Sequence, residues 1–136
     1  MKVSDNIEKG EMDCMEEREI LQQDALKDLV EYSDSLIPAL QELIDELRLE
    51  NKADTKQFLN EVITGINWEI EVYNQCASLI NANNNYVDKK NMISAVKNLG
   101  ITLNSGDNWQ IAGCLEKDFL PFLNKLDLAA KRVLNN

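Results

Sequence analysis

The sequence predicts an all-α fold, an antiparallel four-helix bundle whose first and last helices are kinked by proline. Apolar residues recur at steps of three and four in four separate segments, and the polar stretches between these segments are short. Residues 58–80 carry two adjacent apolar stripes, which make a face wider than one coiled-coil seam. A helix over 55–82 should therefore contact at least two neighbours, and we expect it at the centre of the bundle.

The first helix is expected over 20–50. Its apolar stripe passes Pro38 without a change of register, which favours one helix with a kink near residue 34. The alternative is a separate helix that is capped by Ser35 and holds Pro38 in its first turn.

Turn residues set the ends of the next two helices. The asparagine-rich stretch 81–85 favours a turn after the second helix. The third helix, over 86–99, is expected to be capped by Asn85 and to end at Gly100, because glycine suits the left-handed position after a helix end.

The last helix is expected over 107–134. Asp107 with Gln110 three residues later is a variant of the capping box that opens helices. Pro121 falls within an unbroken apolar stripe, so a second kink is expected there.

A length of 136 residues is that of one ordinary domain. Residues 1–18 are dense in charge and poor in apolar side chains, so we expect them to form an acidic, mobile N-terminal tail. The remaining residues, 19–136, then form a single helical bundle domain.

The net charge of −10 is concentrated in the first part of the chain. Residues 1–86 hold 7 Lys or Arg and 19 Asp or Glu, whereas residues 87–136 hold 7 and 5. An acidic surface repels phosphates, so neither nucleic acid nor an anionic membrane is expected as a partner. No apolar run approaches the ~20 residues that span a bilayer, and the N-terminal residues lack the apolar core of a signal peptide. We expect a cytoplasmic protein.

The residue types favour a protein that is not an enzyme. Histidine, the commonest general base and zinc ligand, is absent, and no Gly-rich phosphate loop is present. Cys14, Cys76 and Cys114 lack metal-ligand spacing and a histidine base, so we interpret them as structural. No catalytic residue, cofactor or metal is expected.

Trp68 is the first candidate contact residue. It falls on the side of the second helix that is expected to face water, where an indole would leave a large apolar area exposed. Either another segment covers it, such as the one around Met12 and Met15, or it belongs to an interface.

Four further candidates accompany it. Asn60, Asn67 and Asn74 recur every seven residues on the same helix, although asparagine is a poor residue inside helices. They form either an amide ladder that binds a partner's backbone or a boundary strip in a chain rich in asparagine. Trp109, two residues after the predicted cap Asp107, is the last candidate interface residue.

Two residues of the second apolar stripe stand out: Gly65, which lies within it, and Glu69, which alone breaks it. Gly65 costs ~1 kcal/mol relative to alanine inside a helix, and we expect its missing side chain to let a neighbouring helix approach closely. Glu69 is either a buried functional carboxylate or a flank residue that reaches water, and the second interpretation is favoured.

Two segments carry a resemblance to a known family. They are Gly65-Ile66-Asn67-Trp68 and the stretch Ile111–Pro121, which reads Ile-Ala-Gly-Cys-Leu-Glu-Lys-Asp-Phe-Leu-Pro. The chain resembles a family of small uncharacterised bacterial helical domains with a Gly-x-x-Trp in the second helix and such a segment in the last. The resemblance covers about residues 20–130 and implies a helical fold with no assigned activity. In size, acidity and helical hairpins the chain is also similar to flagellar-type export chaperones.

Two function classes remain. The preferred one is a non-enzymatic protein-interaction module, either an adaptor or an export-chaperone-like bundle that binds a client helix. The alternative is a small-ligand-binding or weakly catalytic bundle with a pocket between helices. An open apolar groove would favour the first class, and an enclosed pocket with converging polar groups would favour the second.

A homodimer is a further hypothesis. The predicted third helix is about 20 Å long and its long neighbours about 40 Å, so part of their apolar surface stays open unless residues 20–36 fold over it. A twofold contact anchored by Trp68 would bury that surface, although the net charge opposes pairing.

Overall fold

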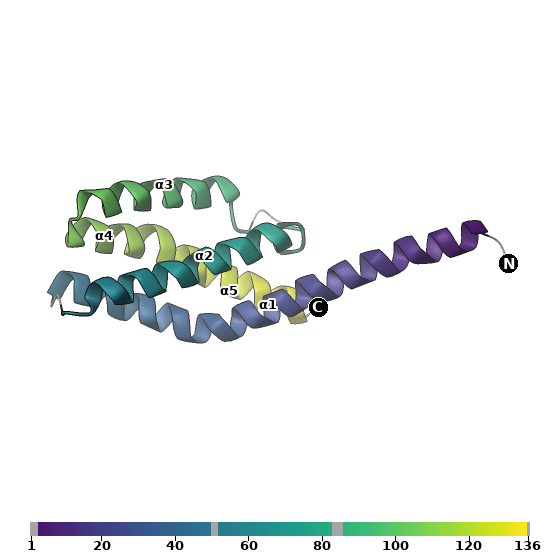
Figure 1. Cartoon of the computed structure of the whole chain (residues 1–136), viewed down its shortest axis with the longest axis horizontal. Helices are drawn as coiled ribbons and strands as arrows, with labels where there is room; N and C mark the ends of the chain where they lie inside the picture. The colour runs from purple at the N-terminus through teal and green to yellow at the C-terminus, as the bar shows by residue number, and fades with distance from the viewer. Residues whose placement is uncertain (1–2, 50–51, 83–85, 136) are drawn as a thin grey trace.

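A computed structural model describes the backbone of residues 3–49, 52–82 and 86–135, and the side chains within these ranges from residue 17 onward. This part of the chain is helical between its turns and contains no strand (Figure 1). The elements are α1 (Val3–Leu49), α2 (Thr55–Ile80), α3 (Lys89–Ser105), α4 (Asn108–Cys114), the π-helical turn η1 (Leu115–Phe119) and α5 (Leu120–Asn135). Because α4, η1 and α5 follow one another without a break, four helices pack together, as predicted.

The other three helices pack around the last helix, α4–η1–α5, rather than around α2. α1 contacts α2, α4, η1 and α5, whereas α2 contacts α1 and α5, and α3 packs against α4 and η1 on the outside of the bundle (Figure 1). The two neighbours predicted for α2 are confirmed. Its predicted place at the centre is wrong, because the last helix packs against α1, α2 and α3, whereas α2 packs against α1 and α5.

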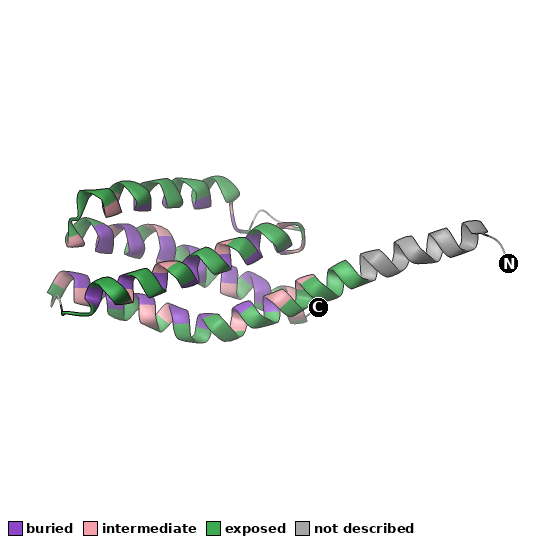
Figure 2. Cartoon of the chain, viewed as in Figure 1, coloured by how far each residue is buried: buried purple, intermediate pink, exposed green. Residues whose placement is uncertain are grey.

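The core lies between α1, α2 and the last helix, where the buried faces of all three turn inward (Figure 2). α3 adds little to it, and most of its surface is exposed. None of the helices in the described ranges has a stretch long and apolar enough to cross a membrane. Large side chains that are almost fully buried form the centre of the core: Leu26, Leu29, Leu40, Leu43, Ile66, Tyr73, Leu115, Phe119, Leu123 and Leu126.

α1 is much longer than the predicted 20–50. It begins at Val3, and its N-terminal part projects beyond the other helices (Figure 1). Glu, Met, Lys and Arg are good helix formers and no proline precedes Pro38, so an established helix can extend through this segment. The division into a mobile tail, 1–18, and a bundle domain, 19–136, stays a prediction.

α3 begins and ends later than predicted. Its N-cap is Asp88, whose Oδ1 accepts a hydrogen bond of 3.0 Å from the backbone N–H of Lys90, and Asn85 lies outside the described residues. The helix runs through Gly100 to Ser105 and is followed by the C-cap Gly106, whose φ of 70° is the left-handed conformation predicted for Gly100. A glycine inside a helix costs only about 1 kcal/mol, so the helix can continue through Gly100. It ends instead at the stronger turn sequence Asn-Ser-Gly, which begins one turn later.

The two prolines are accommodated in different ways. α1 continues through Pro38 as a single helix, which confirms one helix over two, while the kink itself stays a prediction. In the last helix, the wide turn η1 ends just before Pro121, and the N–H of Leu120 bonds to the carbonyl of Leu115. This wider turn gives the proline ring room against the carbonyl four residues earlier. The predicted cap Asp107 is confirmed, since its Oδ1 accepts from the N–H groups of Trp109 and Gln110.

The packing predicts unequal costs for truncations on α2. Ile66 is buried in the core, so Ile66→Ala should lower the free energy of unfolding by ~2–4 kcal/mol. Ser78 is exposed, so Ser78→Ala should change it by less than ~0.5 kcal/mol. Chemical denaturation of both variants measures the difference, and equal losses would contradict the packing of α2.

Candidate functional site

Trp68 and Tyr32 form an aromatic recess where α1 and α2 run side by side. Their rings meet edge to face, with centroids 5.4 Å apart and an interplanar angle of 85°. Trp68 is 36% exposed and Tyr32 is 39% exposed, so each ring keeps part of its surface open to solvent. The recess is wide and shallow, about 680 Å³, and its lining residues are Asp28, Glu31, Tyr32, Ser35, Thr64, Gly65 and Trp68.

Gly65 allows α1 to pass this closely. A Cβ at this position would overlap the Tyr32 hydroxyl and would lie 3.0 Å from Leu36 Cδ1. The prediction that the missing side chain lets a neighbouring helix approach is therefore confirmed. The same close approach places the Tyr32 ring beside Trp68.

The rim of the recess is acidic. Asp28 and Glu31 line it from α1, and both are exposed. Asp24 on α1 and Glu61 and Glu71 on α2 are three or four residues from lining positions, and they are exposed as well. Residues at such spacing share a helix face, so these acidic side chains lie around the aromatic pair, with one basic residue, the exposed Lys27, four positions before Glu31.

Directly behind the recess, Glu69 is buried in the core. Its side chain is 0% exposed, and the Ser33 hydroxyl lies 3.2 Å from Oε1 and 3.0 Å from Oε2. The prediction that Glu69 reaches water is wrong, because the close packing of α1 on α2 seals this level of the seam. Tyr32 and Ser33 are consecutive, as are Trp68 and Glu69, so each helix presents one aromatic side chain outward and one polar side chain inward.

Burial raises the pKa of the Glu69 carboxyl to about 7, because a charge is poorly solvated there. The hydrogen bond from Ser33 lowers this pKa, and the charge of Asp127 on α5 raises it. Asp127 is itself bonded through Oδ2 to Lys131 Nζ at 2.9 Å, while its Oδ1 is buried and makes no hydrogen bond within the described residues. Near neutral pH a substantial fraction of Glu69 is therefore uncharged.

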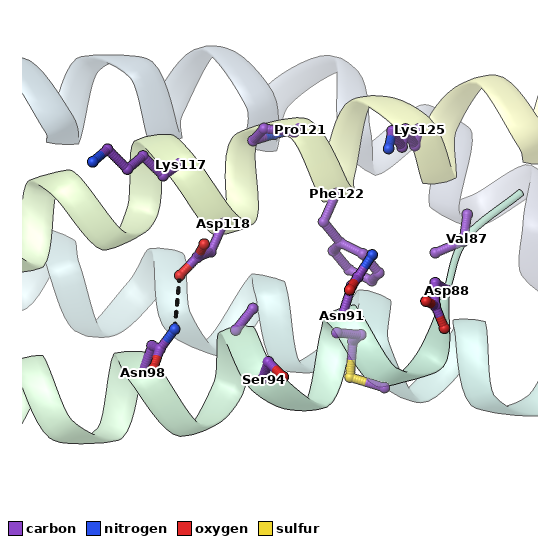
Figure 3. A pocket seen from close by; sticks show the side chains of 12 residues that line it. Val87, Asp88, Asn91, Ser94, Asn98, Lys117, Asp118, Pro121, Phe122 and Lys125 are labelled. Carbon is purple, nitrogen blue, oxygen red and sulfur yellow. Dashed lines mark hydrogen bonds between the residues drawn. The ribbon is translucent and has the colours of Figure 1, made fainter.

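A second pocket, of about 280 Å³, lies between α3 and the η1–α5 segment (Figure 3). At one end Asn98 Nδ2 donates to Asp118 Oδ2 at 3.5 Å, beside Lys117. Asp88 and Lys125 lie toward the other end of the pocket, and Asn91 and Phe122 lie between its two ends. Asp118 belongs to the π-helical turn, a feature frequent at functional sites. The pocket could hold a small polar molecule.

The predicted contact residues do not form one surface. Trp109 is 63% exposed and packs against Arg48, whose guanidinium carbon is 5.6 Å from the ring centroid and whose Nη1 is 2.9 Å from Glu116 Oε2. Arg48 and Tyr32 are about 24 Å apart along α1, so Trp109 lies far from Trp68.

The three asparagines of α2 are exposed. Asn60 lines a different groove, between α2 and the turn from α3 to α4, and not the recess beside Trp68. Asn67 and Asn74 face solvent on the same helix. Asn81, one further repeat along, does bind a backbone, but it is that of its own chain: Oδ1 accepts from the N–H of Val87 at 3.0 Å. A partner for the other three stays a prediction.

The described cysteines are buried thiols. Burial raises the pKa of Cys76, and burial together with Asp118 raises that of Cys114 to about 11. A high pKa keeps a thiol protonated and poorly nucleophilic, which agrees with a structural role. The side chain of Cys14 lies outside the described residues, as do those of Met12 and Met15. Among the side chains that are described, no group of three metal-ligating residues could hold an ion.

A family model for a domain of unknown function, DUF8042, matches residues 24–128. The chain belongs to the DUF8042 family. This confirms the resemblance to an uncharacterised helical family, and the match includes the aromatic recess, Glu69 and the pocket at η1. No curated protein and no solved structure shows significant similarity to the chain.

In this DUF8042 domain, the sequence did not indicate Tyr32 as a neighbour of Trp68, and the burial of Glu69 was the less favoured of two interpretations. Tyr32 flanks the apolar stripe of α1 and carries no local signal that it faces Trp68. The sequence does carry a signal for the burial of Glu69: Ser33 and Glu69 each interrupt an apolar stripe, on helices expected to be antiparallel neighbours. Two polar residues at matching levels of such stripes can satisfy each other when both are buried.

The close approach at Gly65 predicts the outcome of two glycine substitutions in the DUF8042 domain. Gly65→Ala should push the Tyr32 ring away from Trp68 and gain no stability, whereas Gly100→Ala, which has open space around it, should gain up to ~1 kcal/mol. In a Trp109→Phe background Trp68 is the remaining tryptophan, so the fluorescence spectrum reports the surroundings of its ring. An unchanged spectrum with equal stabilisation by both alanines would contradict the close approach.

The buried Glu69 predicts how stability depends on pH. Between the ordinary pKa of 4.5 and the folded value of about 7, the unfolded chain has released the proton while the folded chain retains it. The free energy of unfolding should therefore fall as pH rises through this window, by about 3 kcal/mol from this residue.

Glu69→Gln should remove that contribution, and Glu71→Gln, an exposed control on the same helix, should keep it. Urea denaturation of the three proteins at pH 5 and pH 8 measures the difference. An identical pH dependence for Glu69→Gln and wild type would show that Glu69 is not buried as described.

Proposed function

We propose that the protein is a non-enzymatic protein-interaction module that binds a partner at the Tyr32–Trp68 recess. One observation carries the proposal: two aromatic rings stay partly exposed in an open recess on the seam between two helices. Aromatic side chains are enriched among the residues that contribute most to binding energy, and they cluster where a partner can exclude water.

The recess is open, which fits an adaptor or chaperone surface better than an enclosed ligand site. The absence of histidine and the protonated state of the two buried thiols support a role without catalysis. A cytoplasmic location, expected from the sequence, belongs to the same proposal.

A second candidate function is the binding of a small ligand in the pocket between α3 and η1–α5. Converging amide, carboxylate and ammonium groups around an apolar floor favour it (Figure 3). The pocket is smaller than most sites for drug-sized ligands, so we rank this function second.

A homodimer is the third possibility and keeps the status of a hypothesis. Residues 20–36 could lie on their own bundle or on a second copy, and they pack on their own bundle, with Leu26 and Leu29 fully buried. A twofold contact through the recess would place its acidic rim against an identical acidic rim, which is unfavourable.

Affinity capture from the source organism with immobilised protein tests the proposal. Partners that are retained by wild type and by Trp109→Ala, but lost with Trp68→Ala, are the expected result. Retention by all three proteins, or no protein partner together with a reproducible small molecule, would contradict it. Light scattering of the same samples identifies a second copy as the partner, since the chain alone has a mass of 15.5 kDa.

A further inference from the structure

We propose that the partner segment at the Tyr32–Trp68 recess is a basic amphipathic helix, with an apolar anchor that contacts the aromatic pair and Lys or Arg residues beside it. This inference rests on the proposed function and specifies its partner. It follows from three features of the recess: its aromatic wall, its position over a helix seam, and its charge.

The aromatic pair accounts for the anchor. Trp68 and Tyr32 expose part of their rings toward the same recess, and Gly65, which also lines it, contributes no side chain. A bulky aliphatic or aromatic residue of the partner would bury the exposed parts of both rings at once. Such a contact excludes water from a large apolar area, which is the usual source of affinity at an interface.

The position of the recess explains why we expect the partner segment to be a helix. It follows the seam between α1 and α2, so its lining side chains come at helical spacing from two antiparallel helices: 28, 31, 32 and 35 on one, and 64, 65 and 68 on the other. A third helix packs naturally into such a seam, with anchors at steps of three and four.

The charge around the recess accounts for a basic partner. The exposed acids are Asp24, Asp28 and Glu31 on α1 and Glu61 and Glu71 on α2. One basic residue, the exposed Lys27, lies four positions before Glu31, while 24, 28 and 35 on α1 and 61, 64, 68 and 71 on α2 hold no Lys or Arg, so the charge around the recess remains acidic. Lys or Arg beside the anchor would meet these carboxylates, whereas an acidic helix or a second copy of this face would be repelled.

A labelled synthetic peptide tests the inference. The probe is an amphipathic Leu/Lys helix of about 18 residues, five turns long, and binding is followed by fluorescence anisotropy. The control probes are the same peptide with glutamate in place of lysine, and one of identical composition whose sequence is scrambled so that it has no apolar face.

The protein variants separate specific docking from general attraction between opposite charges. Asp28→Lys/Glu31→Lys reverses charge at the recess, and Asp45→Lys/Asp54→Lys makes the same change at exposed positions outside its lining. Trp68→Ala removes the aromatic wall, and Trp109→Ala removes an exposed indole elsewhere. Circular dichroism confirms that each variant is folded.

The expected result is that the basic amphipathic peptide binds wild type, and that Trp68→Ala and the recess charge reversal each weaken it about tenfold or more. The two control variants should change its affinity less than about twofold. Equal weakening by both charge reversals, equal binding of the scrambled or acidic peptide, or no effect of Trp68→Ala would overturn the inference. Trp68-dependent capture of a partner without a basic helix would overturn it too while leaving the proposed function intact.

Discussion

The close contact between α1 and α2 at Gly65 is the constraint on which the rest of the structure depends. Without a Cβ at this level, the Tyr32 ring lies over the backbone of α2, and the two helices come together closely enough to seal Glu69 from solvent. α1 also packs against α4, η1 and α5 through its leucine-rich face. One missing side chain thus shapes both the core and the surface.

The two sides of this contact have opposite chemistry. On the outside, Tyr32 and Trp68 leave apolar ring surface exposed within an acidic rim. On the inside, Ser33 and Glu69 place a hydrogen-bonded polar pair within an apolar core. A buried carboxyl is costly when ionised, and its raised pKa offsets that cost by keeping much of it neutral. The recess that rests on such a pair is held in register by it, because sliding either helix would separate the hydroxyl from the carboxyl.

The exposed faces of the helices explain why a partner is proposed at α1–α2 and not elsewhere. α3 also exposes apolar residues, Ile93, Val96 and Ile101, but they stand apart from the pocket beside it. Trp109 is exposed, yet Arg48 already covers one side of its ring and is bound to Glu116. Only at the α1–α2 recess, among the described residues, do two exposed aromatic rings and an acidic rim coincide.

Local sequence alone determined the helices, their order, the cap at Asp107, and the role of Gly65, because helical periodicity and capping depend on residues three or four positions apart. It also placed Trp68 on an exposed face. Other features depended on contacts between distant segments: the last helix as the one that the others share, Tyr32 as the neighbour of Trp68, the burial of Glu69, and the pocket over η1. These could not be predicted from periodicity, because a stripe shows which side of a helix is buried but not which neighbour covers it or how closely. Burial of a side chain at the edge of a stripe is decided by the distance between two helices, and that distance exists only in the folded chain.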